Sequence, residues 1–396
     1  MSGIRHFLLR LVVATLLAVV TTATVPHRIA SREAPAWYSG DRELEERLAQ
    51  SVRSATQKTL VSHPFATGSA HFDSEWLFGT YMMAAMGFGQ MALEHPELAP
   101  GAGEDMDRCI EGMLGERARS YDRSKWGEDP IASLGGGHGH VAYLGYMNLA
   151  LGLRRLLDRD NRWSSLNDEI TGALERRILA TEGFLETFPG ETYPVDNASA
   201  VGSLGLHGRA TGASHRRAID AWLLRMRVHA LDREGLLVQA TTPRGAPRDA
   251  GRGSGTFLAS YFLSYADRGA SAALYDAGRH SLYRTLLGFG AMREYGGEQG
   301  GGDPGKSSKG DIDSGPVVLG LGVSSSGFSL GPSRAHGDPE TFRGVYALTH
   351  LFGVPVDTSG KRTFATGGPL GDSILLAMLT APRTFPNDPL AREELP

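Results

Sequence analysis

The sequence predicts an all-α protein, an (α/α)6 toroid in which six helical hairpins close into a ring and the loops hold short β-ribbons at most. One observation is a repeat: apolar, helix-like runs recur at intervals of 57 to 64 residues. The other is that charged, amphipathic stretches alternate with these runs. The predicted inner helices begin near six residues: Glu75, Gly139, Asp196, Gly255, Asp313 and Asp372.

The amphipathic stretches are predicted to form the outer layer of the ring. Their apolar residues recur at three and four positions, as in Leu44, Leu48, Val52 and Ala55, which is typical of a helix with one solvated face. A helix that is apolar on every side must be buried on every side, so the other six helices belong inside. An open solenoid would favour repeats of about 33 to 47 residues and polar caps. The predicted outer helices begin at Asp41, Gly103, Ser164, Ser214, Ala270 and Asp338.

The composition is that of a globular protein and excludes several functional classes. Forty basic and forty-four acidic residues give a net charge of -4, and they form no basic block, so we expect no nucleic-acid partner. The single cysteine, Cys109, excludes an intramolecular disulfide framework and a cysteine-based metal cluster. We expect no cofactor and assign no metal ligands, although D-x-D at Asp311 and Asp313, with a histidine, is also a metal-binding pattern.

The ends of the chain are predicted to lie outside the toroid. Arg5 and Arg10 precede an apolar stretch and then small residues, so residues 1–25 have the pattern of a signal peptide or of an N-terminal membrane anchor. Residues 26–40 are interpreted as a linker, 41–382 as the toroid, and 383–396 as a loose tail. The body is therefore expected outside the cytoplasm: periplasmic, extracellular or anchored to the membrane.

Acidic residues at the starts of the apolar runs are the candidate catalytic groups. Parallel inner helices would gather their N-termini, with their N–H groups and dipoles, in one funnel. Two close carboxylates push one pKa upward, which suits acid-base chemistry. We expect Asp313 to be the general acid or base, Asp311 to tune its pKa and Asp196 to be the second carboxylate. Helix capping is the alternative for Asp196, Asp313 and above all Asp372.

Histidines and aromatic residues near the same helix starts complete the candidate site. His138 and His140, in the glycine-rich stretch GGGHGH, are candidates for proton relay, and Tyr193 is a candidate for orienting the substrate. Aromatic side chains on the inner helices would form a stacking wall or part of the core. The other candidate substrate contacts are Glu75, Trp76, Tyr143, Asn197, Tyr261 and Asp372.

Three stretches resemble the linalool dehydratase/isomerase-like family and, more distantly, the six-hairpin glycosidases. They are GHVAYLGYMNLALGLRRLLDRDNRW, YPVDNASAVGSLGL and GDIDSGPV. The resemblance implies an α/α toroid and a pocket in which acids, a histidine and tyrosines do the chemistry. The family's pair of pocket cysteines has no counterpart in ETYPVDNASAVG.

The predicted function is that of an exported enzyme that uses acid-base carboxylates on an uncharged small molecule, an apolar alcohol or a sugar. The resemblance favours a lyase or isomerase of the hydratase-dehydratase type. A six-hairpin glycoside hydrolase is the first alternative, and a non-catalytic envelope protein that binds a sugar or lipid is the second.

Overall fold

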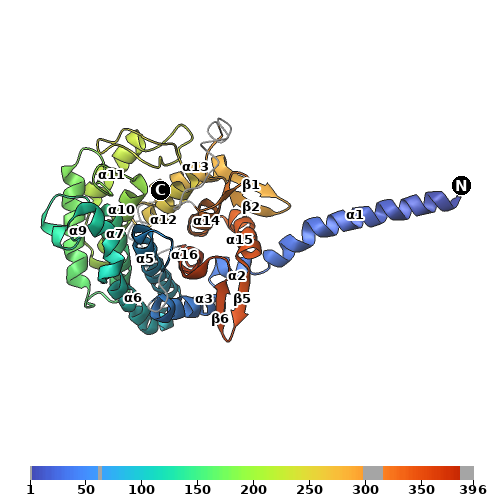
Figure 1. Cartoon of the computed structure of the whole chain (residues 1–396), viewed down its shortest axis with the longest axis horizontal. Helices are drawn as coiled ribbons and strands as arrows, with labels where there is room; N and C mark the ends of the chain where they lie inside the picture. The colour runs from blue at the N-terminus through green and yellow to red at the C-terminus, as the bar shows by residue number, and fades with distance from the viewer. Residues whose placement is uncertain (1, 61–64, 298–314, 384–396) are drawn as a thin grey trace, which may run out of the picture.

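Six inner helices form a closed ring in the computed structural model, which describes residues 2–60, 65–297 and 315–383 (Figure 1). Each inner helix contacts the next along the chain, and α16 packs against α5. Because the last inner helix meets the first, the ring is closed and the toroid prediction is confirmed. The inner helices are α5 (Ala70–Glu94), α8 (Val141–Leu157), α10 (Pro194–Thr211), α12 (Gly253–Leu263), α14 (Val323–Ala335) and α16 (Gly368–Leu379).

A second layer of helices surrounds this ring (Figure 1). In α3, Leu48 and Val52 are buried whereas Glu43 is exposed, as expected for a helix with one wet face. The outer helices are α3 (Arg42–Ser54), α6 (Ala99–Leu114), α9 (Ser164–Ala180), α11 (Arg216–His229), α13 (Arg268–Leu282) and α15 (Pro339–Gly353). Shorter elements are α2 (Ala34–Ser39), the π-helix η1 (Ala55–Thr59), the 3-10 turns η2 (Pro96–Leu98) and η3 (Ala132–Gly135), and α7 (Glu116–Trp126).

The inner helices run in the same direction. Between α8 and α10, Gly145 lies against Ser199 and, two turns later, Gly152 lies against Leu206. A Cβ atom on Gly145 would stand 2.3 Å from Ser199 Oγ, so the helices approach closely only because glycine is there. Other neighbouring inner helices show the same pattern, in which the contacts advance along both helices together. The contacts are Phe78–Tyr143 and Gly89–Leu153 for α5 and α8, Gly202–Phe262 and Gly205–Tyr265 for α10 and the segment of α12, Gly253–Ser325 and Tyr261–Gly331 for α12 and α14, and Gly79–Leu370 and Gly87–Leu376 for α5 and α16. The inner helices therefore begin at one end of the ring, here called the N-terminal face.

Strands within the described residues form three two-stranded antiparallel ribbons, as predicted. The strands are β1 (Tyr283–Leu286), β2 (Phe289–Met292), β3 (Val317–Val318), β4 (Leu321–Gly322), β5 (Pro355–Thr358) and β6 (Lys361–Phe364). The prediction that an inner helix begins at Asp313 is wrong, because α14 begins at Val323. Leu319 and Gly320 both have positive φ, so they form a tight turn between β3 and β4 and separate the valines from the helix.

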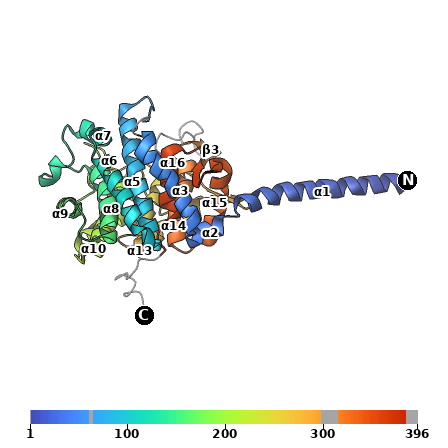
Figure 2. The same ribbon diagram turned by 90° about the horizontal axis from the view of Figure 1, so that it is seen from below.

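The N-terminal helix α1 (Ser2–Ala30) extends away from the ring in both views (Figures 1 and 2). Within the described part of the chain, no helix has the combination of length and apolar character needed to cross a bilayer. The predicted location outside the cytoplasm stays a prediction.

Residues 26–40 are not the linker that we expected. Residues 26–30 continue α1, and α2 places Ala34 and Trp37 in the core. Glu33 accepts a hydrogen bond from Arg362 Nη1 at 2.8 Å, which ties this segment to β6. The reason for the error is that Pro35 stands at the start of a helix, where its missing N–H costs nothing.

A buried arginine joins several elements at the end of the ring opposite the N-terminal face. Arg334, near the end of α14, is fully buried and donates to the carbonyl oxygens of Ala381 at 2.6 Å and Tyr38 at 3.2 Å. It also donates to Glu94 Oε2 of α5 at 2.6 Å, and Glu45 Oε1 of α3 lies 3.9 Å from its Nη2. One side chain thus connects the first and last hairpins.

Glu45 is the weakly compensated member of this group and predicts a dependence of stability on pH. It is fully buried, and neither of its oxygens accepts a hydrogen bond from a described residue, although His95 Nε2 lies 3.2 Å from Oε2. Burial raises its pKa from 4.5 to about 8. Below about pH 4.5 the carboxyl is protonated in both the folded and unfolded states, and stability falls as the pH rises toward 8. Glu45→Gln should therefore match the natural protein near pH 5 and exceed its free energy of unfolding by on the order of a few kcal/mol near pH 8.5.

Urea unfolding at the two pH values checks this expectation. Glu46→Gln is the matched control, since the Glu46 side chain is partly exposed on the same helix and pairs with Arg42 at the surface. Its effect should be small at both pH values. A Glu45→Gln variant that is less stable than the natural protein at pH 8.5 would contradict the expectation.

Candidate functional site

Solvent reaches the first two turns of every inner helix at the N-terminal face. Much of each helix is buried, yet each has a large side chain there that is partly exposed. Five of the six are apolar or aromatic, and the sixth is a carboxylate. These residues are Trp76 of α5, Tyr146 of α8, Asp196 of α10, Leu258 of α12, Phe328 of α14 and Ile374 of α16. The face therefore combines an apolar wall with an acid.

Asp196 lies in the first turn of α10 but does not cap it. The N-cap position is Tyr193, whose backbone is extended because Pro194 follows. Asp196 Oδ1 accepts a hydrogen bond from Tyr146 Oη at 2.8 Å, and Oδ2 accepts one from Thr187 Oγ1 at 2.9 Å. Two donated hydrogen bonds and the helix N-terminus all favour the ionised carboxylate. The capping alternative for Asp196 is thus not realised.

Asn197 holds the neighbouring segment in place. Its Oδ1 accepts from the Leu185 N–H at 2.8 Å, and its Nδ2 donates to the Leu185 carbonyl at 2.9 Å. The side chain is buried, so this amide positions the chain that carries Thr187. Tyr193 donates from Oη to Glu191 Oε2 at 3.2 Å, and its own N–H donates to Thr187 Oγ1.

A histidine cluster lies just before α8. His140 Nδ1 is 2.6 Å from Asp122 Oδ2, and both side chains are fully buried. His138 is exposed, and its Nδ1 is 2.9 Å from Glu128 Oε2. The Trp126 ring stacks on both imidazoles, with centroids 4.5 Å from His140 and 5.3 Å from His138.

The electrostatics of the two carboxyl groups in this cluster differ. Burial raises the pKa of Asp122, although the hydrogen bond with His140 opposes the rise. The hydrogen bond from His138 lowers the pKa of Glu128, which is exposed enough to stay ionised. The cluster thus places one enclosed and one accessible acid around two imidazoles.

Glu75 and Trp76 lie near the start of α5 and are partly exposed. His71 Nε2 is 3.6 Å from Glu75 Oε2, one helical turn away. The Trp76 ring meets Phe65 edge to face, with centroids 5.7 Å apart. The His71 ring in turn lies edge-on to Tyr121 and to Phe188, so α5 contributes both an acid and aromatic surface to the N-terminal face.

Tyr143 and Tyr261, which we considered as substrate contacts, lie in the core. Both are fully buried. Tyr143 Oη donates to the Met113 carbonyl at 3.0 Å, and Tyr261 Oη donates to Gln90 Oε1 at 3.0 Å. On a helix that is enclosed by neighbours all round, an aromatic residue more often packs than lines a pocket.

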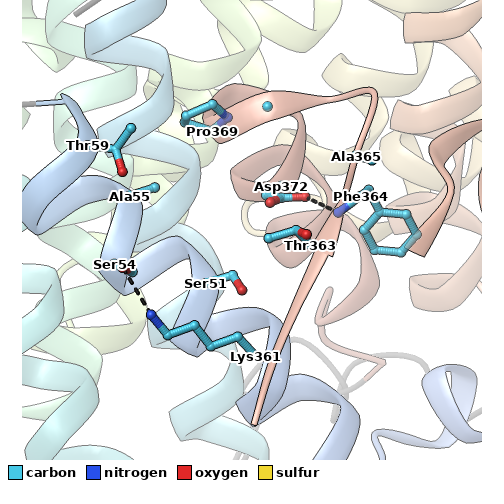
Figure 3. A pocket seen from close by; sticks show the side chains of 11 residues that line it. Ser51, Ser54, Ala55, Thr59, Lys361, Thr363, Phe364, Ala365, Pro369 and Asp372 are labelled. Atoms are coloured by element: carbon cyan, nitrogen blue, oxygen red, sulfur yellow. Dashed lines mark hydrogen bonds between the residues drawn. The ribbon is translucent and has the colours of Figure 1, made fainter. Parts of the chain in front are cut away.

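Asp372 faces away from the ring axis and lines a separate pocket of about 320 Å³ (Figure 3). It lies two residues from both Leu370 and Ile374, and hence on the opposite side of α16. Helix α16 begins at Gly368, so Asp372 is in its second turn, and the capping prediction is wrong. Its Oδ1 accepts the Phe364 N–H at 2.8 Å, and burial raises its pKa to about 7. The other lining residues include Ser51, Ser54, Thr59, Lys361 and Thr363.

Sequence reasoning missed several residues of the site. Asp311 and Asp313, its main candidates, lie outside the described residues. Asp122, Trp126, Glu128 and Thr187 were not singled out, although they contact His140, His138 or Asp196. No periodicity marks Asp122 as a site residue, because it is a buried acid in the amphipathic helix α7. Trp126 and Glu128 stand just before the glycine-rich His-x-His stretch, and this position is a weak indication that they belong to the site.

Solved glycosidase structures share this arrangement of helices. An unsaturated glucuronyl hydrolase responsible for glycosaminoglycan degradation, from Bacillus sp. GL1, matches with a TM-score of 0.53 and 13% identity over 86% of this chain and 96% of that chain. A UGL variant with dGlcA-Glc-Rha-Glc matches with a TM-score of 0.51 and 13% identity over 84% and 95%. The chain shares their six-hairpin toroid fold. At this identity the likeness shows the fold alone.

An α-mannanase from Bacteroides thetaiotaomicron matches with a TM-score of 0.47 and 11% identity over 84% of this chain and 94% of that chain. No family model and no curated protein matches the chain. None of the three structures is a linalool dehydratase/isomerase, so that resemblance stays a prediction.

Proposed function

We propose that this chain is a glycoside hydrolase whose substrate binds at the N-terminal face of the ring. The observation that carries the proposal is the Asp196 carboxylate, held by Tyr146 and Thr187 in the first turn of α10. Partly exposed aromatic side chains on α5, α8 and α14 surround the same face. Aromatic rings that stack on sugars beside a fixed carboxylate are the parts that glycan cleavage requires.

Glycoside cleavage needs two carboxyl groups with separate tasks. One protonates the leaving oxygen, and the other acts as a nucleophile or activates water. The hydrogen bonds from Tyr146 and Thr187 favour Asp196 as the nucleophile or base, the role that needs an ionised carboxylate. Glu75 is the candidate for the second group among the described residues, and Asp313, with Asp311 beside it, is the candidate outside them. The glycosidases that share the fold support the proposal by analogy.

A lyase or isomerase that acts on an apolar alcohol is the second candidate. The specific observation that favours it is the apolar character of Leu258, Phe328 and Ile374 at the same face. Such chemistry requires one proton donor and one acceptor in an apolar setting, and Tyr146 beside Asp196 offers such a pair.

A substrate panel separates the two candidates. Purified protein is incubated with neutral and uronic-acid-containing oligosaccharides, and released sugars are measured as new reducing ends. In parallel, tertiary terpene alcohols are incubated with the protein and analysed for alkenes by gas chromatography. Sugar release that depends on Asp196 is the expected result. Alkene formation without sugar release would favour the second candidate. If neither sugars nor alkenes form, both candidate functions are contradicted.

A further inference from the structure

The histidine cluster before α8 contains a buried nitrogen atom whose lone pair is unused. His140 Nδ1 lies 2.6 Å from Asp122 Oδ2, so this nitrogen carries the proton that the carboxylate accepts. Nε2 is then an acceptor. It is buried and has no hydrogen-bond partner among the residues that the structure describes, and Glu128 Oε2 lies 3.7 Å away. A buried acceptor without a partner is costly, which calls for an explanation.

Two further donor atoms lie beside this nitrogen. His138 Nδ1 is 2.9 Å from Glu128 Oε2, and one ligand atom from each of Glu128, His138 and His140 lies within 4.8 Å of the other two. Atoms bound to one Zn²⁺ ion at about 2.0–2.2 Å are separated by roughly 3–4 Å. The two distances to Glu128 are close to this spacing, and the exposed ring of His138 has room to turn.

We propose that Glu128, His138 and His140 bind one divalent transition-metal ion of the Zn²⁺ type. Asp122 is the orienting partner: it holds His140 in the tautomer that presents Nε2, as carboxylates behind metal-bound histidines do. Two nitrogens and one oxygen favour Zn²⁺ over Ca²⁺ or Mg²⁺, which prefer oxygen ligands. Three protein ligands leave a coordination position open, and Glu128 and His138 lie on the solvent side of the site.

The loop that carries the ligands is held in a fixed shape before any ion binds. Arg177 is buried and donates to the carbonyl oxygens of Ser133 at 2.5 Å and Gly139 at 3.2 Å. Trp126 stacks on both imidazoles and donates from Nε1 to the Thr187 carbonyl at 3.2 Å. The loop backbone and the His140 ring are therefore preorganised, whereas His138 turns to bind the ion, and the site adjoins Asp196 through Thr187.

The test is a titration of the full-length protein, freed of metal by a chelator and dialysed, with Zn²⁺ in a calorimeter. Co²⁺ serves as a spectroscopic probe, because its visible absorption reports nitrogen and oxygen ligation. We expect one Zn²⁺ per chain and a rise in the unfolding temperature with Zn²⁺ concentration. His138→Ala and His140→Ala should each weaken binding by at least about 10-fold, and Asp122→Asn, which leaves all three ligands in place, by about 10- to 100-fold.

A second histidine cluster provides the matched control. His207 and His215 lie 2.8 Å apart, and their remaining ring nitrogens pair with Asp168 and Glu175. All four nitrogens are in use there, so His215→Ala should leave Zn²⁺ affinity unchanged. His138 is exposed, so His138→Ala should fold even if His140→Ala does not. Absence of Zn²⁺ binding, or equal affinity in His138→Ala and the natural protein, would overturn the proposal.

Discussion

The Asp196→Asn variant is expected to lose about 10²- to 10⁴-fold of the turnover number while it folds like the natural protein. Asparagine keeps the shape of the side chain, and its carbonyl oxygen still accepts a hydrogen bond from Tyr146 or Thr187. The substitution removes the negative charge, the ability to take or give a proton, and one of the two acceptor oxygens. The turnover number is measured on the sugar substrate found in the panel, and circular dichroism confirms the fold.

Asp372→Asn is the matched control for this variant. Asp372 is also an acid near the start of an inner helix, but it lines the pocket on the outer side of α16. Its replacement should leave turnover within a few-fold of the natural value. If Asp196→Asn also keeps its turnover number within a few-fold of the natural value, Asp196 takes no part in the mechanism. Asp313→Asn tests the second carboxyl in the same assay, with an expected loss of similar size if Asp313 is the acid.

The Arg334→Met variant is expected to lose about 3–5 kcal/mol of its free energy of unfolding. Methionine fills most of the space but leaves the Glu45 and Glu94 carboxylates without their buried cation. The carbonyl oxygens of Tyr38 and Ala381 also lose their donor. Urea unfolding followed by circular dichroism measures the loss.

Arg383→Met provides the comparison, because Arg383 also approaches Glu94, at 3.6 Å, but is half exposed. An exposed pair contributes about 0–1 kcal/mol, so this variant should be nearly as stable as the natural protein. Near pH 8.5, adding Glu45→Gln to Arg334→Met should restore part of the loss, because Glu45 would otherwise have to take up a proton on folding or be buried as an unpaired charge. A loss below about 1 kcal/mol for Arg334→Met would show that the buried network contributes little.

The ring could be predicted because each inner helix is buried on every side, so apolar runs recur at nearly even intervals along the sequence. Five of the six predicted inner helices begin within five residues of the predicted position, as at Gly255, where α12 begins at Gly253. The predicted helix start at Asp313 was wrong because the short strands β3, Val317–Val318, and β4, Leu321–Gly322, are as apolar as a buried helix. Over so short a run, apolar character does not separate a strand from a helix.

The site was less predictable than the ring. Asp196 was found because it precedes an apolar run, and His138 and His140 were found because glycines flank them. Contacts between separate segments, such as that of Asp122 in α7 with His140 before α8, follow no regular spacing along the chain. Tyr143 and Tyr146 are one turn apart on α8, yet only Tyr146 reaches solvent, and periodicity alone does not distinguish them.

The closed ring has no first helix in a physical sense. Helix α16 packs on α5, and near this junction Arg383 Nη2 donates to the Ser39 carbonyl at 3.3 Å, so the two ends of the ring meet. A short bridge between them would let the chain be opened in any surface loop with its packing preserved, as circular permutation requires. New ends placed between α11 and α12 would give the same ring from a gene that starts at a different hairpin.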